Sequence, residues 1–235
     1  TQLDPNNAEA QQIYASLLGE TGDIMAVIDA KEKALAADPK NVNLMFGLGK
    51  MYFKEQMFPE AIAKFDLLLA ITPKDIGALE YKGSALQNEE RYSDAIKSYE
   101  KILAIQPEHV KIMCEMATCY RALGNLRQAV SFAQKSIRTN SNFGLGYVVK
   151  GEVYEAAADA CIGKRDKRIT NFDDKLVYEK AYKQYQVAST KNDDSSDLAK
   201  RKMSYIKQEI PTNEDRFMHP DQKQPKLDCY TWLPN

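Results

Sequence analysis

The sequence of 235 residues lacks a long hydrophobic run. Its longest apolar stretch, Leu67 to Ile71, is far shorter than the roughly 20 residues that a helix needs to span a bilayer. We therefore expect no direct insertion of this segment into a membrane.

An excess of one charge sign is also missing, because 32 Lys and Arg residues are balanced by 33 Asp and Glu residues. Such a balance provides no long-range field that would attract nucleic acid or an anionic membrane surface. We therefore expect no nucleic acid as a partner. The hydrophobic content of 44% is high enough for a sizeable buried core, so the chain should be folded.

Histidine and cysteine are scarce. The two histidines, His109 and His219, belong to no cluster with metal-ligand spacing, so no metal site is expected. The four cysteines contain no CxxC pair; they are Cys114, Cys119, Cys161 and Cys229. Cys114 and Cys119 point in different directions around a helix and cannot form a disulfide within it. We expect unpaired, mostly buried thiols, which leaves the redox compartment undetermined.

Recognisable catalytic patterns are absent too. No Ser or Cys stands at a familiar distance from a His, and no Gly-rich phosphate loop occurs. Paired carboxylates occur only at ordinary helix-surface positions such as Glu89-Glu90 and Asp173-Asp174. We interpret Asp173 and Asp174 as acids at the positive end of a helix. The sequence therefore predicts no enzymatic activity and no cofactor.

Prolines, in contrast, recur at a fixed interval. Pro5, Pro39, Pro73 and Pro107 are each 34 residues apart, and Ser141 takes the next position. Proline is poorly tolerated inside a helix, so each one marks the end of a helical unit. The residues that close these boundary segments are suited to capping the next helix; they are Asn7, Asn41 and Asp75.

One unit, Val42 to Asp75, has a well-defined pattern of signature residues: Met45, Leu48, Gly49, Tyr52, Ala61, Phe65 and Pro73. These residue types at these spacings resemble the tetratricopeptide repeat, a 34-residue helix-turn-helix unit. Leu48 and Tyr52 lie on one face of the first helix, and Gly49 allows the second helix to come close.

The resemblance implies an all-α fold, namely a right-handed α-solenoid of helix-turn-helix repeats with a C-terminal capping helix and an irregular tail. The first repeat is degenerate, with Tyr14, Ala15, Val27 and Lys31 at signature positions. The predicted boundaries are 1–7 for the end of a truncated upstream repeat, 8–41, 42–75, 76–109 and 110–143 for four repeats, 144–190 for a fifth, 195–210 for the capping helix and 211–235 for the tail.

The chain begins at Thr1 without a methionine, and Asp4-Pro5 resembles the end of an earlier repeat. We therefore expect that a preceding part of the natural protein is missing, together with any signal or anchor. The localisation stays undetermined.

The fifth repeat is interrupted. Its apolar pattern continues through Ala157 to Cys161 and resumes only at Tyr178, which predicts a lengthened first helix and an insertion near 157–174. The insertion contains a basic run of Lys164, Arg165, Lys167 and Arg168. This run is either a solvated loop or a docking point for an acidic partner.

The capping helix over 195–210 has one apolar stripe, which suits a helix that covers the last repeat. The tail contains the only tryptophan, Trp232. It either docks on the repeats or presents its aromatic end to a partner. We expect docking of Phe217 to Leu233, with Trp232 or Tyr230 buried against the insertion or the capping helix, because a free apolar terminus is a liability.

The resemblance also implies a binding surface, a concave groove formed by the first helices of successive repeats. Its predicted residues are Asn43, Phe46, Lys50, Phe53, Lys54, Glu80, Tyr81, Ser84, Asn88, Lys111, Cys114, Thr118 and Arg121. This mixture of aromatics, amides and single charges suits an extended or helical peptide. A merely solvated face explains it less well, because two exposed phenylalanines, Phe46 and Phe53, need cover.

We therefore predict a non-enzymatic scaffold that binds a protein or peptide segment in this groove. The alternative is structural, with the same surface used for homo-oligomerisation. The carboxylate clamp that some family members use for chaperone tails is not formed in either possible register of the repeats. The balanced charge also disfavours the helical-repeat RNA readers, which need basic grooves.

Overall fold

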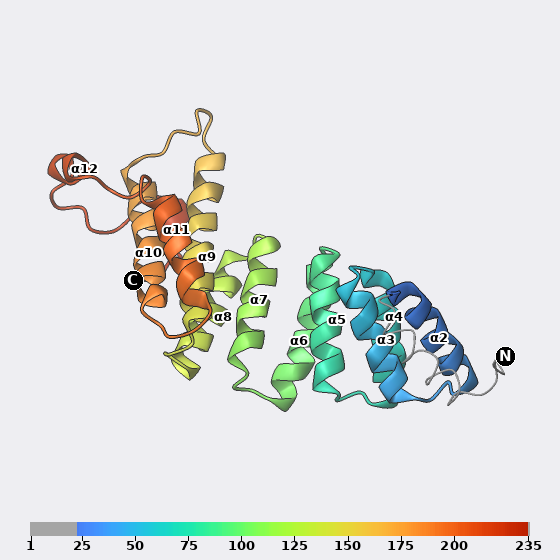
Figure 1. The fold of residues 1–235 in the computed structure, drawn as a ribbon. Helices are drawn as coiled ribbons and strands as arrows, with labels where there is room; N and C mark the ends of the chain where they lie inside the picture. The colour runs from blue at the N-terminus through green and yellow to red at the C-terminus, as the bar shows by residue number, and fades with distance from the viewer. Residues whose placement is uncertain (1–22, 235) are drawn as a thin grey trace. The chain divides into compact units, whose positions relative to one another are not determined.

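The computed structural model describes residues 23–234, and all regular structure in this part of the chain is helical. The predicted all-α class is therefore confirmed. None of these helices is long and apolar enough to cross a membrane. The predicted upstream repeat end 1–7 and the first helix of repeat 8–41 lie outside the described residues. The chain forms two compact units, one ending at Ile105 and one beginning at Gln106 (Figure 1).

The described part of unit 1 is a row of helices: α2 (Ile24–Ala37), α3 (Val42–Lys54), α4 (Phe58–Ile71), α5 (Ile76–Asn88) and α6 (Tyr92–Ile105). Each helix packs on the next, and α3 also contacts α5. This is the packing of stacked helix pairs, in which the first helices of neighbouring pairs touch (Figure 1).

Side-chain caps set the starts of the first helices in unit 1. The Asn41 carboxamide oxygen accepts the backbone N–H of Leu44 at 3.0 Å, and Asp75 accepts that of Ala78 at 2.8 Å. Each bond satisfies a donor that the first helical turn leaves unpaired. The predicted capping roles of Asn41 and Asp75 are thus confirmed, whereas Asn7 lies outside the described residues.

Glycine makes the close contact between paired helices possible. A Cβ atom at Gly49 would lie 2.7 Å from the ring of Phe65, closer than real Cβ contacts. The ring of Tyr99 lies in the same way against Gly83 of the next pair. The predicted role of Gly49, to allow the second helix to approach, is confirmed.

Unit 2 contains α7 (Val110–Ala122), α8 (Leu126–Thr139), α9 (Gly144–Gly163), α10 (Phe172–Ser189), α11 (Ser195–Ile206), α12 (Asn213–Met218) and the 3-10 turn η1 (Asp228–Tyr230). The helices α3, α5, α7 and α9 begin 34 residues apart along the sequence. Helix α9 has 20 residues where α7 has 13, and residues 164–171 connect it to α10. Helix α11 packs on α10 and α9 and ends at Ile206, earlier than the predicted residue 210.

The tail is more ordered than predicted, since it contains α12 and η1. Tyr230 is only 2% exposed, and its hydroxyl donates to the carboxylate of Asp174 at 2.5 Å. Asp174 also accepts the guanidinium of Arg165 from the insertion. The predicted docking is confirmed for Tyr230 but wrong for Phe217, which is 82% exposed.

A disulfide joins the tail to the fifth repeat. Cys161 of α9 is bonded to Cys229, with 6.0 Å between their Cα atoms. The expectation that no cysteine forms a disulfide is therefore wrong for this pair and correct for Cys114 and Cys119, which are buried. Sequence spacing did not indicate the bond because its partners are 68 residues apart and meet only when the tail docks.

Candidate functional site

The predicted groove residues of unit 1 lie on α3 and α5, the two first helices that contact each other. On α3, Phe46, Lys50 and Phe53 recur at intervals of three and four residues, which places them on one helix face. Tyr81 projects from α5 and contacts both phenylalanines. Two helices thus contribute to one continuous surface.

Four rings form what we call the aromatic cluster: Phe46, Phe53, Phe65 and Tyr81. Tyr81 is its centre, with ring centroids 5.8 Å from Phe46 and 5.5 Å from Phe53 in edge-to-face geometry. It also stacks on the fully buried Phe65 at 5.7 Å. Such arrangements are the favoured geometries of aromatic pairs. The outer rings of the cluster are therefore held in place by a core residue.

The exposure of Phe46 and Phe53 differs from the prediction. Both rings are half-buried, because each one packs against the edge or face of Tyr81. Helix α5 therefore shields part of the two rings, a role that the sequence analysis assigned to a bound partner. The outer part of each ring stays accessible.

Lys50 lies over this cluster. Its Nζ atom is 5.7 Å from the ring centroid of Phe46 and 5.7 Å from that of Tyr81. The ammonium group has no ion-pair partner within residues 23–234, so the ring faces are its charge-stabilising contacts. It remains available to an acceptor on a bound molecule.

Polar side chains surround the cluster. Asn43, Lys54 and Asn88 are exposed, whereas Glu80 and Ser84 are half-buried. The Asn88 carboxamide donates to the backbone carbonyl of Ser84 at 2.8 Å, which orients it along α5. The surface thus combines an apolar centre with a hydrogen-bonding rim.

A small cavity adjoins the cluster at Phe46. Its volume is about 210 Å³, and its wall also includes Val42, Asn43, Leu68 and Asp75. That volume corresponds to roughly seven waters at about 30 Å³ each, enough for an aliphatic side chain. The cavity extends the surface toward the start of α3.

The predicted groove residues of unit 2 differ widely in exposure. Lys111 is exposed on α7, and Thr118 and Arg121 are half-buried. Cys114 is 1% exposed, and its thiol lies 3.3 Å from the hydroxyl of Ser136. The prediction of Cys114 as a groove residue is therefore wrong. Burial raises the pKa of this thiol to about 12, although the hydrogen bond with Ser136 opposes the rise, so the thiol is an inert core group.

Arg121 belongs to a row of charges in unit 2. Its guanidinium lies 3.6 Å from the carboxylate of Glu152 on α9, which also binds Lys202 of α11 at 2.9 Å. Two cations thus share the carboxylate of Glu152, and the buried Nε of Arg121 has no hydrogen-bond partner in the described chain. The first-helix surface of unit 2 is thus ionic, in contrast to the aromatic surface of unit 1.

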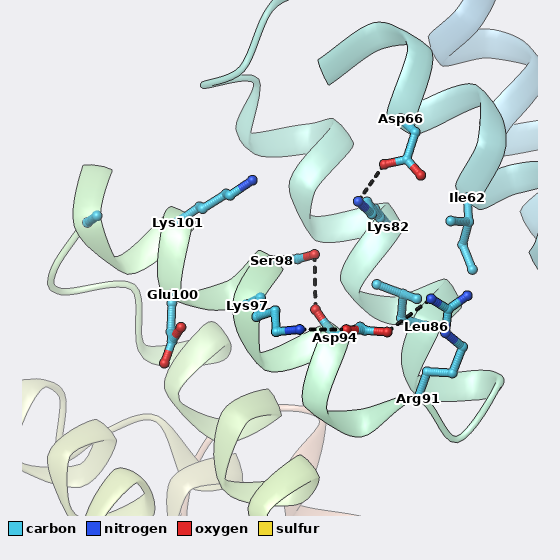
Figure 2. A pocket seen from close by; sticks show the side chains of 11 residues that line it. Ile62, Asp66, Lys82, Leu86, Arg91, Asp94, Lys97, Ser98, Glu100 and Lys101 are labelled. Carbon is cyan, nitrogen blue, oxygen red and sulfur yellow. Dashed lines mark hydrogen bonds and ion pairs between the residues drawn. The ribbon is translucent and has the colours of Figure 1, made fainter. Parts of the chain in front are cut away.

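Unit 1 has a second hollow, which the sequence did not predict (Figure 2). This cavity of about 690 Å³ lies among α4, α5 and α6, and none of the predicted groove residues lines it. Its charges largely neutralise one another, since Lys82 binds Asp66 and both Arg91 and Lys97 bind Asp94 (Figure 2). Hydrogen bonds from Lys97 and Arg91 lower the pKa of Asp94. The alternating charges are typical of a solvated helix face.

The described part of the chain contains no candidate metal site. No three His, Cys, Asp or Glu side chains gather there in a way that could hold an ion. The surface of unit 1 offers ring faces, the ammonium groups of Lys50 and Lys54, and amide donors. Those groups can bind a chain segment that carries both polar and apolar groups.

Comparisons with solved structures agree with this fold. The structure of a MamA protein has a TM-score of 0.59 and 22% identity, covering 76% of this chain and 92% of that chain. A MamA segment from Desulfovibrio magneticus RS-1 has a TM-score of 0.61 and 14% identity, covering 82% and 100%. YrrB, described as a TPR protein with an unusual peptide-binding site, has a TM-score of 0.56 and 18% identity, covering 79% and 91%. No curated protein sequence matches.

Family models give the assignment. Two models of the tetratricopeptide repeat match the chain, one over residues 6–76 and the other over 86–142. Together they span more than half of it. The fold described above has the helix pairs and the close glycine contacts that this repeat requires. The chain therefore belongs to the tetratricopeptide-repeat family.

Proposed function

We propose that this chain is a non-enzymatic interaction scaffold that binds a peptide or protein segment on the α3 and α5 surface of unit 1. The observation that carries the proposal is the aromatic cluster, whose outer rings of Phe46, Phe53 and Tyr81 remain partly accessible. The description of YrrB as a peptide-binding TPR protein supports the same general activity.

Preorganisation favours this surface. Because Tyr81 stacks on the buried Phe65, the rings lose little freedom when a ligand covers them. Aromatic side chains at the centre of an interface commonly contribute most of the binding free energy. The cluster is thus suited to act as the anchor site.

The rim gives the surface its selectivity for a polypeptide. Asn43 and Asn88 can hydrogen-bond to a peptide backbone, and the ammonium group of Lys50 can bind a carbonyl or carboxylate oxygen. The cavity at Phe46 has room for one apolar side chain of the ligand. An extended segment with one apolar anchor satisfies all of these groups.

The test uses a peptide selected from a displayed random library against the whole chain. We expect Phe53→Ala to weaken its affinity by about thirtyfold, the loss typical of an interface hot spot. Lys50→Ala should weaken it less. The matched controls are Tyr92→Ala and Lys101→Ala on α6, which should leave affinity unchanged. Fluorescence polarisation gives the affinities, and circular dichroism verifies the fold.

The proposal fails if Phe53→Ala and Tyr92→Ala change the peptide affinity by the same factor while both variants keep their helical signal. It also fails if the Lys101→Ala control loses as much affinity as Lys50→Ala, since the bound surface would then include α6.

A further inference from the structure

A separate cavity lies in unit 2, where the tail meets the α7–α8 turn and the end of α9. Its volume is about 280 Å³, and it is lined by Leu126, Arg127, Ala157, Ala160, Lys164 and Trp232, among others. It therefore contains the only tryptophan of the chain and the first residue of the basic run. The proposed peptide site in unit 1 uses none of these residues.

Two contacts of the tail fix the position of Trp232 in the cavity wall. The Cys161–Cys229 disulfide anchors the chain three residues before Trp232. The indole N–H donates to the carbonyl of Cys229 at 2.8 Å, so its polar atom is satisfied within the tail. The indole therefore contributes only apolar ring surface to the cavity wall.

The charge of the lining has one sign. Arg127 and Lys164 are the only charged residues among the lining residues, and neither has an ion-pair partner in the described chain. The Arg127 guanidinium lies 6.0 Å from the ring centroid of Trp232. Lys167 and Arg168 follow in the same loop and are exposed. The exposed acids next to these segments are Asp166 in the loop and Asp228 beside Cys229, and the loop keeps a net positive charge.

The end of α9 opposes an anion, because helix carbonyls carry partial negative charge there. Two of those carbonyls are already satisfied. The Cys161 carbonyl accepts the N–H of Lys164 at 3.3 Å, and the Ile162 carbonyl accepts that of Arg165 at 3.1 Å. Two full positive charges outweigh the remaining partial charge.

We propose that this cavity binds a small organic anion. Its apolar body would contact Ala157, Ala160 and Trp232, and its carboxylate or phosphate group would lie between Arg127 and Lys164. The cavity holds the volume of roughly nine waters, which admits a small ring with one anionic group. Charge-assisted hydrogen bonds to two cations give the site its preference for anions.

The probes are benzoate and phenyl phosphate, with neutral benzamide as the same-shaped control. Trp232 reports binding directly, because it is the only tryptophan and lies in the cavity wall. We expect a saturable change in its fluorescence with benzoate and a benzamide affinity at least about tenfold lower. The ratio between the benzoate and phenyl phosphate affinities identifies the preferred anionic group.

Charge variants locate the site. Arg127→Gln and Lys164→Gln should each weaken benzoate binding by about tenfold, as expected for a lost charge-assisted hydrogen bond. Arg138→Gln, at the exposed far end of α8, is the matched control and should bind as the parent chain does. The proposal is overturned if neither benzoate nor phenyl phosphate produces a saturable change, if benzamide binds equally well, or if Arg138→Gln weakens binding as much as Arg127→Gln.

Discussion

At the scale of single residues, two glycines of unit 1 test how closely the helices pack. A Cβ atom at Gly83 would collide with the ring of Tyr99, whereas one at Gly47 would meet no atom within 4 Å. Gly83→Ala should therefore destabilise the fold by about 1–3 kcal/mol through overpacking. Gly47→Ala should stabilise it by about 0.5–1 kcal/mol, because alanine favours the helix.

Urea unfolding followed by circular dichroism measures both changes. The two variants are chemically identical substitutions in first helices, so each serves as the control for the other. A stabilising effect of Gly83→Ala equal to that of Gly47→Ala would show that the α5–α6 contact is looser than described.

Signature residues were the most predictable part of the chain. Leu48, Ala61 and Phe65 are all fully buried, in keeping with the mechanical roles that their spacing indicated. Cys114 was not predictable in this way, although it occupies the same repeat position as the half-buried Phe46. It packs in a cluster with Ala117, Ala133 and Val149, and a cysteine behaves there as a small hydrophobe.

At the scale of elements, helix starts followed local chemistry. Asn41 and Asp75 are capping residues that sequence alone identifies, and both form the expected bonds. The tail contacts were harder to predict, because Asp174 looks like an ordinary first-turn acid. Its bonds to Tyr230 and Arg165 depend on segments that meet only in the folded unit.

The tail as an element should depend on its disulfide. Cys161 and Cys229 close a loop of 68 residues, and the chain-entropy model gives such a link about 4 kcal/mol of stabilisation. We expect reduction to lower the midpoint of the unfolding transition detected by Trp232 fluorescence. The measurement is urea unfolding with and without reductant.

A double variant, Cys161→Ala with Cys229→Ala, is the control for reagent effects. Its midpoint should lie below that of the oxidised parent and should not change with reductant. If the reductant lowers both midpoints equally, the effect does not come from the Cys161–Cys229 bond. If it lowers neither and both midpoints are equal, the bond makes no contribution to stability.

At the scale of the whole molecule, the alternative of self-assembly can be separated from the receptor function. A stable dimer usually buries about 800 Å² of each partner. The outer rings of the aromatic cluster already cover one another in part. A fully buried aromatic side chain buries about 150–250 Å², so three half-buried ones expose less apolar area than such an interface needs.

We therefore expect the chain to be a monomer over a wide concentration range. Light scattering after size-exclusion chromatography measures the mass, with Phe53→Ala as the test variant and Tyr92→Ala as its control. A dimer that Phe53→Ala weakens and Tyr92→Ala does not would assign the α3 and α5 surface to assembly. A monomer at every concentration leaves the aromatic cluster free to bind a peptide, because no second copy of the chain then competes for its rings.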